Sequence, residues 1–204
     1  MKIIYSLLLS CVAWTLLAQR TPAPRQTQPV LITGATLHVG NGQVIENSTL
    51  SFEKGRFTIV GDVASRPATG DGYTIIDASG KHIYPGVIAP NTQLGLVEIE
   101  AVRATLDNRE VGALNPNIRS LIAYNTDSKI TPTVRSNGVL LAQVTPQGGR
   151  ISGQSSIVTL DAWNWEDAAY AVDDAIHLNW PTLFRCMGWW AEPGLSPHRG
   201  FRSL

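Results

Sequence analysis

The sequence predicts an α/β protein that begins with a separate small β module. Within residues 30–84, short β-rich runs alternate with turn signals such as "GNG" at Gly40–Gly42. After Pro85, strand-like runs alternate with helix-like stretches, a pattern that favours βα units and a parallel sheet. The chain has 204 residues, of which 44% are apolar and 16% charged. This composition supports a buried core, and the length allows one domain or a small domain plus part of a larger one.

Residues 1–18 have the pattern of a secretory signal peptide. Lys2 precedes an apolar run that ends at Ala18, so we expect cleavage before Gln19 and export to the periplasm or the extracellular space. The alternative is a membrane anchor, but the run is shorter than the roughly 20 residues that a spanning helix needs. A lipoprotein site at Cys11 is disfavoured because this cysteine lies early in the run. We therefore expect no stable membrane insertion after cleavage.

Charge and cysteine content exclude several classes of protein. Sixteen basic residues balance sixteen acidic ones, so no electrostatic pattern indicates a nucleic-acid partner. Removal of the signal peptide leaves Cys186 as the remaining cysteine. A lone thiol cannot form an internal disulfide framework. A cysteine that packs in the interior needs no catalytic role.

The first part of the mature chain is predicted to be a linker followed by strands. Residues 19–29 carry three prolines and are typical of a linker. The next residues predict an antiparallel module of four or five strands. Its expected strands are "VLIT", "ATLHV", "QVIENSTLSF", "RFTIVG" and "YTIIDASGKHIY", with turns at "GNG" and "EKG".

The second part, residues 85–204, is predicted to mix strands and helices. "PGVIAP" reads as a short strand, whereas "GLVEIEAVRATLDN" could be a helix or an extended loop. The stretches "SLIAYNTD" and "ITPTVRSNGVLLAQVTP" together predict a step from helix to strand that ends in a loop, and "GVLLAQV" in the second is a buried-strand run. A glycine-rich loop, "QGGRISGQ", and a strand, "SSIVTLDA", come next. Asn164 is the expected cap of a helix in "NWEDAAYAV".

The β module and the junction "IIDASGKHIYPGVIA" resemble the N-terminal part of the amidohydrolase superfamily, close to its imidazolonepropionase-like members. The resemblance covers roughly residues 30–180. It implies a small β-sandwich at 30–84, followed at 85–204 by the first, incomplete part of a TIM-type (β/α)8 barrel. Family members hydrolyse C–N bonds of cyclic amides or amidines. They use zinc or another divalent metal bound by a His-x-His pair, and alternate residues of one strand can reach one ion.

The resemblance preserves the junction and loses the metal ligands. Pro85, Gly86 and Ile88 match the family pattern, and Val87 is a conservative replacement that we expect to fill the barrel interior together with Ile88. Ala89 stands where the family has Asp, and Asn91 and Gln93 stand where it has the two histidines. Neutral amides are poor zinc ligands. We therefore expect no metal at this position and no cofactor in this chain.

Other candidate residues follow the junction. A loop with glycines after a buried strand could approach a ligand with its backbone amides; it comprises Gly148, Gly149, Arg150, Ser152, Gly153 and Gln154. A tight turn explains the same glycines. His177 lies near Asp173 and Asp174, so the three are weak candidates for an acid–base or metal cluster. Five late tryptophans could stack on a ligand or pack against a helix, and packing is favoured: Trp163, Trp165, Trp180, Trp189 and Trp190. His38, His82 and His198 are read as structural or solvated.

Length limits the functional expectation. A (β/α)8 barrel needs about 250 residues, and Pro85 to Leu204 supplies about half of that. The resemblance therefore implies a truncated or degenerate hydrolase acting on a small-molecule substrate, inactive alone. The alternative is a non-catalytic exported binding or assembly module, and a weaker one is an active hydrolase with a different metal shell in a longer chain. Unpaired sheet edges would favour self-association.

Overall fold

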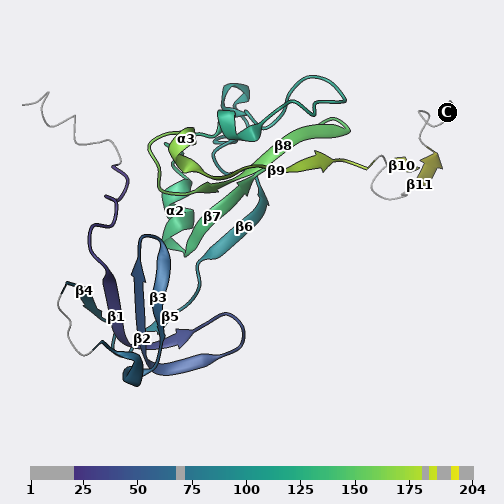
Figure 1. Ribbon diagram of the computed structural model, residues 1–204. Coiled ribbons are helices and arrows are strands. Elements are labelled where there is room, and N and C mark those ends of the chain that lie inside the picture. Colours follow the sequence, from purple (N-terminus) through teal and green to yellow (C-terminus); the bar gives the residue numbers. More distant parts are fainter. Residues whose placement is uncertain (1–20, 68–71, 181–183, 188–193, 198–204) are drawn as a thin grey trace, which may run out of the picture. The chain divides into compact units, whose positions relative to one another are not determined.

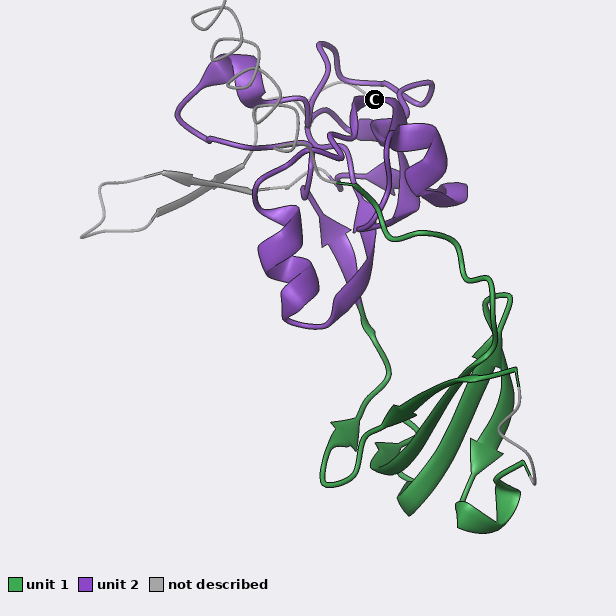
Figure 2. Ribbon diagram, turned by 90° about the vertical axis from the view of Figure 1, so that its left-hand side faces the viewer, with its two compact units in different colours: residues 1–87 green, residues 88–204 purple. Residues whose placement is uncertain are grey.

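The structure is a computed structural model that describes residues 21–67, 72–180, 184–187 and 194–197. The chain divides into two compact units, residues 1–87 and 88–204 (Figure 2). The expected signal peptide lies outside the described residues, as do Trp189, Trp190 and His198. Within the described ranges, no helix is long and apolar enough to cross a membrane.

The first unit contains one five-stranded sheet (Figure 1). Its strands are β1 (Val30–His38), β2 (Val44–Glu53), β3 (Arg56–Gly61), β4 (Thr74–Asp77) and β5 (His82–Ile83), with a short 3₁₀ helix, η2 (Val63–Ser65), after β3. The order is β3-β2-β1-β4, and β5 also pairs with β1. The expected antiparallel pairing holds for β1, β2 and β3, but it is wrong for β4 and β5, which run parallel to β1.

Positive backbone dihedrals explain both predicted hairpins. The two residues between β2 and β3, Lys54 and Gly55, have φ values of 51° and 74°. Positive φ at both central residues is what a tight two-residue hairpin turn requires. Between β1 and β2, Gly40 and Gly42 also have positive φ, and the Val39 amide donates to the Gln43 carbonyl at 3.0 Å.

A glycine joins the two expected strands "VLIT" and "ATLHV" into the single strand β1. Gly34 has φ 82°, and the strand register shifts between Thr33 and Ala35. A Cβ atom at Gly34 would lie 2.5 Å from Oγ of Ser79. The bulge therefore needs glycine, because the turn after β4 approaches the backbone closely. The core of this unit is small: Leu31, Ala35, Leu37, Leu50 and Ala78.

The second unit contains a four-stranded sheet with the order β6-β7-β8-β9. Its strands are β6 (Val87–Thr92), β7 (Val139–Val144), β8 (Ile151–Thr159) and β9 (Ala169–Leu178). Short helices connect them: η3 (Arg103–Thr105), η4 (Ser120–Ala123), α2 (Thr131–Ser136) and α3 (Trp165–Ala168). Two further strands, β10 (Phe184–Met187) and β11 (Gly194–Pro197), form a separate antiparallel pair.

One βα unit of the predicted parallel sheet is present. The Thr145 amide donates to the Thr92 carbonyl at 2.9 Å, so β6 and β7 end side by side and run in the same direction, with α2 between them in sequence. The predicted step from helix to strand is present, with η4 in "SLIAYNTD" and with α2 followed by β7 in "ITPTVRSNGVLLAQVTP". The expectation of further parallel strands is wrong for β8 and β9, because β7–β8 and β8–β9 are antiparallel.

The core of the second unit lies around the sheet and the short helices. It consists of Leu96, Leu121, Tyr124, Ala142, Val144, Val158, Leu160 and Ala168. Trp165 packs against this cluster, whereas Trp163 and Trp180 are 57% and 80% exposed. The expectation that Val87 and Ile88 fill a barrel interior is wrong for the described chain, because their side chains are 53% and 56% exposed.

Candidate functional site at the end of β6

The two amide residues in the metal-ligand positions are held at the end of β6. Asn91 has φ 49°, and its backbone N–H donates to Oε1 of Gln143 on β7 at 3.1 Å. Oε1 of Gln93 accepts a hydrogen bond from Nδ2 of Asn108 at 2.6 Å. Ala89, the third position of the set, packs against the apolar core. The end of β6 is thus a polar surface tied to neighbouring segments.

These residues do not fit a catalytic zinc ion. Zinc sites use thiolate, imidazole and carboxylate ligands, whereas Ala89 has no donor atom and Asn91 and Gln93 offer neutral amide oxygens. The oxygen of Gln93 already accepts the bond from Asn108. Among the described residues, no three His, Cys, Asp or Glu side chains gather closely enough to hold a metal ion.

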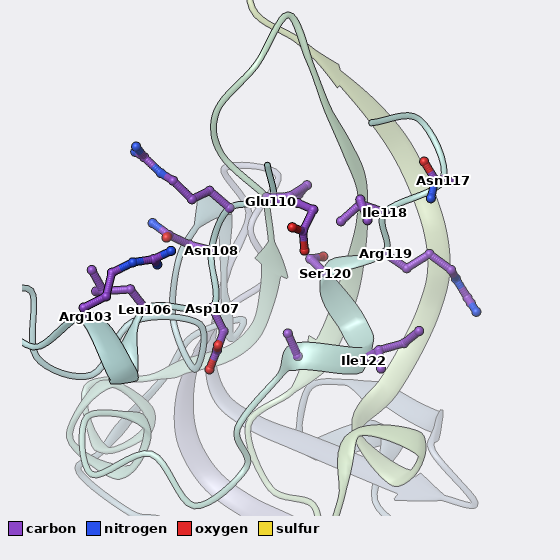
Figure 3. A pocket seen from close by; sticks show the side chains of 13 residues that line it. Arg103, Leu106, Asp107, Asn108, Glu110, Asn117, Ile118, Arg119, Ser120 and Ile122 are labelled. Carbon is purple, nitrogen blue, oxygen red and sulfur yellow. The ribbon is translucent and has the colours of Figure 1, made fainter. Parts of the chain in front are cut away.

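The first of two neighbouring cavities adjoins this end of the strand. The first, of about 560 Å³, is lined by Gln93, Val97, Glu100, Arg103, Leu106, Asn108 and Arg109. The second, of about 480 Å³, shares four of these residues and adds, among others, Glu110 and Arg119. In Figure 3, Arg103 and Asn108 lie on one side of the second cavity, and the Arg119 side chain points away from them. We call the shared lining of Arg103, Leu106, Asn108 and Arg109 the arginine pocket.

The arginines of these cavities differ in their partners. Nε of Arg119 donates to Oδ1 of Asp173 at 2.8 Å, and this bond and the carboxylate charge raise the pKa of Arg119 further. Arg103 and Arg109 form no ion pair with any of the described residues. A guanidinium group without a carboxylate partner can bind an external carboxylate through two hydrogen bonds. Sequence reasoning missed Arg103, Asn108 and Arg109, because they lie in and after a stretch whose periodicity did not decide between helix and loop.

The glycine-rich stretch is built around a neighbouring segment of the same chain. Its second half, including Ser152, Gly153 and Gln154, belongs to β8 and is not a loop. Residues 109–119 run beside it and form three isolated parallel bridges. A Cβ at Gly149 would lie 2.9 Å from the Ala113 carbonyl, and one at Gly153 would lie 2.6 Å from the Ile118 carbonyl. Glycine is needed at both positions for this close approach.

The polar groups of that stretch are used within the protein. The amides of Arg150 and Gln154 donate to the carbonyls of Ala113 and Ile118, at 2.7 Å in both cases. Oγ of Ser152 donates to the Gly148 carbonyl at 2.6 Å. These contacts give the glycines a structural role, and a ligand role for Gly148–Gln154 stays a prediction.

His177, Asp173 and Asp174 are on β9 and have separate partners. Asp173 pairs with Arg119, and Asp174 accepts hydrogen bonds from Oγ of Ser155 at 2.7 Å and Nε2 of Gln143 at 2.6 Å. His177 lies opposite Gly153 on β8, and its Nε2 is buried without a hydrogen-bond partner among the described residues. The structure therefore does not join the three side chains in one hydrogen-bonded group.

Comparison with known proteins identifies the architecture. No family model matches the chain, and no curated protein matches it. A crystal structure of an amidohydrolase from Thermotoga maritima MSB8 matches 73% of the chain with a TM-score of 0.66 and 18% identity. The chain has an amidohydrolase-like fold. It spans 38% of the length of that amidohydrolase. A prolidase complexed with N-methylphosphonate-L-proline matches 35% of the chain, with 21% identity and a TM-score of 0.30.

Proposed function

We propose that this chain is an amidohydrolase-like protein that binds a small carboxylate-bearing cyclic amide at the arginine pocket and does not hydrolyse it alone. The substrate class, C–N bonds of cyclic amides or amidines, follows from the family resemblance. The observation that carries the proposal is the position of the pocket, which adjoins Gln93 at the end of β6. The ends of strands are where ligands bind in barrel folds.

The chemistry of the pocket supports the carboxylate. Arg103 and Arg109 provide two cations without ion-pair partners in the described part of the chain. Asn108 and Gln93 supply amide groups that can hydrogen-bond a ring amide, although their mutual bond must open or be shared. Two charge-assisted contacts and one amide contact are sufficient to orient a small ring.

The absence of hydrolysis follows from the donor set at β6. Hydroxide generation by zinc needs a metal-bound water, and Ala89, Asn91 and Gln93 are unsuited to hold that metal. The chain spans 38% of the length of the matched amidohydrolase. We propose a degenerate form of the architecture, in which any catalytic groups would have to come from outside the described residues.

Binding of two related rings tests the proposal. Pyroglutamate is a five-membered cyclic amide with a carboxylate, and 2-pyrrolidone is the same ring without it. In ligand-observed NMR we expect pyroglutamate to bind and 2-pyrrolidone to bind at least about tenfold more weakly, because only the first can pair with the arginines. Arg103→Gln and Arg109→Gln should each weaken the binding of pyroglutamate, and Arg56→Gln, in the other unit, should not. Equal binding of the two rings would contradict the proposed carboxylate.

A non-catalytic exported binding or assembly module is the second candidate. The hydrogen bond between Gln93 and Asn108 favours it, because it occupies a position that an enzyme of this type would need for its metal. Ring binding separates the two candidates. Binding of pyroglutamate that Arg103→Gln weakens would support the first candidate, whereas failure of the purified chain to bind either ring would support the module.

A further inference from the structure

Two histidines far apart in the sequence meet in the first unit. His38 is the last residue of β1, and His82 is the first residue of β5. The parallel pairing of these strands places Thr36 opposite His82 and Leu37 opposite Ile83. His38 and His82 are therefore two positions apart in register, and alternation along the strands turns their side chains to the same face of the sheet.

The ring nitrogens of this pair are at a chelating distance. Nε2 of His38 and Nδ1 of His82 lie 3.1 Å apart as a hydrogen-bonded pair, whose proton an incoming ion would displace, and the two rings are tilted by 31°. Two metal–nitrogen bonds of about 2.1 Å, set at roughly 90–110° to each other, place their nitrogens about 3.0–3.4 Å apart. The observed separation lies within this range. We propose that His38 and His82 form a two-imidazole site for a divalent transition-metal ion.

A stacked tyrosine orients the site. The ring of Tyr84 lies 4.3 Å from that of His38, centroid to centroid, with 9° between their planes. Stacking restricts the rotation of His38, so less conformational entropy is lost when its nitrogen binds an ion. His82 is exposed, which leaves the remaining coordination positions open to water.

The donor set determines which ions the site takes. Imidazole suits Cu²⁺, Ni²⁺ and Zn²⁺, whereas Ca²⁺ and Mg²⁺ prefer oxygen. No third His, Cys, Asp or Glu of the described residues completes the shell, so the two imidazoles must supply the protein's share of the affinity. We expect Cu²⁺ to bind more tightly than Ni²⁺ or Zn²⁺.

A copper and zinc titration tests the site. The chain is used without a histidine tag and with Cys11→Ser and Cys186→Ser in every variant, so that neither thiol competes. The Cu²⁺ spectrum in electron paramagnetic resonance should show coupling to two nitrogens. His38→Ala and His82→Ala should each weaken Cu²⁺ and Zn²⁺ binding at least about tenfold, because each leaves a single ligand. His198→Ala is the control and should bind as the parent chain does.

Folding is checked in the same variants. Zn²⁺ should raise the unfolding temperature of the parent chain and not that of His82→Ala, whereas the two should unfold at the same temperature in chelator. If His38→Ala does not fold, His82→Gln at the exposed position provides the same test. The absence of Cu²⁺ binding in the parent chain would overturn the proposal, and so would binding that is lost in His198→Ala and retained in His82→Ala.

Discussion

At the residue scale, the composition of each candidate site depends on contacts between residues that are distant in the sequence. The sequence located Asn91 and Gln93 in the metal-ligand positions of the resemblance, and the structure places both at the end of β6. It could not locate Asn108, because the bond between Asn108 and Gln93 depends on how a stretch without clear periodicity returns to the strand. It also could not show that His38 meets His82, since that contact depends on the parallel pairing of β5 with β1.

Gly95 is a position where a single methyl group should be costly. It has φ 73°, and a Cβ there would lie 2.4 Å from Cε2 of the buried Tyr124. We expect Gly95→Ala to destabilise the second unit by about 2–4 kcal/mol, from backbone strain and from overpacking. Gly138→Ala is the matched control in the same unit, because φ is 89° and no atom lies within 4 Å. It should cost about 1 kcal/mol. Urea unfolding measures both, and equal losses would contradict the clash.

Burial of Tyr124 should make stability depend on alkaline pH. Its side chain is 5% exposed, and burial raises the pKa of its hydroxyl above the ordinary value of about 10. Above that pH the unfolded chain loses the tyrosine proton while the folded chain keeps it. Unfolding then releases a proton, so the free energy of unfolding falls as the pH rises. Urea unfolding between pH 8 and about pH 11.5 should show a steeper fall for the parent chain than for Tyr124→Phe. Parallel profiles would show that Tyr124 does not contribute.

At the element scale, local signals succeeded where the turn chemistry was specific. "EKG" and "GNG" require positive φ, and both became hairpins. The strands after α2 were harder to predict, because a buried run does not reveal the direction of its neighbour. β8 pairs with β7 and β9 through antiparallel ladders, and the register shifts three times along β8 and β9. Segment 109–119, which is remote in sequence, forms bridges to Ile151 and Gln154 of β8, on either side of the first of those shifts.

Asn164 caps a helix as predicted, but this helix, α3, is only a single turn long. Oδ1 of Asn164 accepts from the Asp167 amide at 2.8 Å, and Oδ2 of Asp167 accepts from the Trp163 amide at 3.1 Å. The chain then enters β9 at Ala169. We expect Asn164→Ala to lower the free energy of unfolding of the second unit by about 1 kcal/mol. Asn164→Asp keeps the acceptor and should stay near the parent value. A loss of equal size in both variants would show that the cap bond is unimportant.

At the scale of the whole molecule, two compact units carry different polar chemistry. The first unit brings two imidazoles together, and the second places amides and guanidinium groups at a strand end. The resemblance implied a sandwich and part of a barrel. The described residues form one five-stranded sheet and one mixed four-stranded sheet, and the incomplete barrel stays a prediction. Closure of a barrel depends on pairing between strands that are distant in the chain. Local sequence patterns do not show which strands pair in this way.

This division of chemistry predicts where zinc binds in the intact chain. Zinc held by His38 and His82 should survive Gln93→Ala and Asn91→Ala, since amide oxygens add little affinity for zinc. The same zinc should be lost in His82→Ala.

Because no zinc-bound water is then positioned at the end of β6, hydrolysis of pyroglutamate by the purified chain should stay at the metal-free background with zinc, manganese or iron added. Elemental analysis measures the zinc content, and an assay of the glutamate formed by ring opening measures hydrolysis on the same samples. Zinc that disappears in Gln93→Ala, together with turnover that chelator abolishes and metal restores, would show that β6 contributes to a working metal centre. His177, whose buried Nε2 lacks a partner among the described residues, would then be the first ligand to examine.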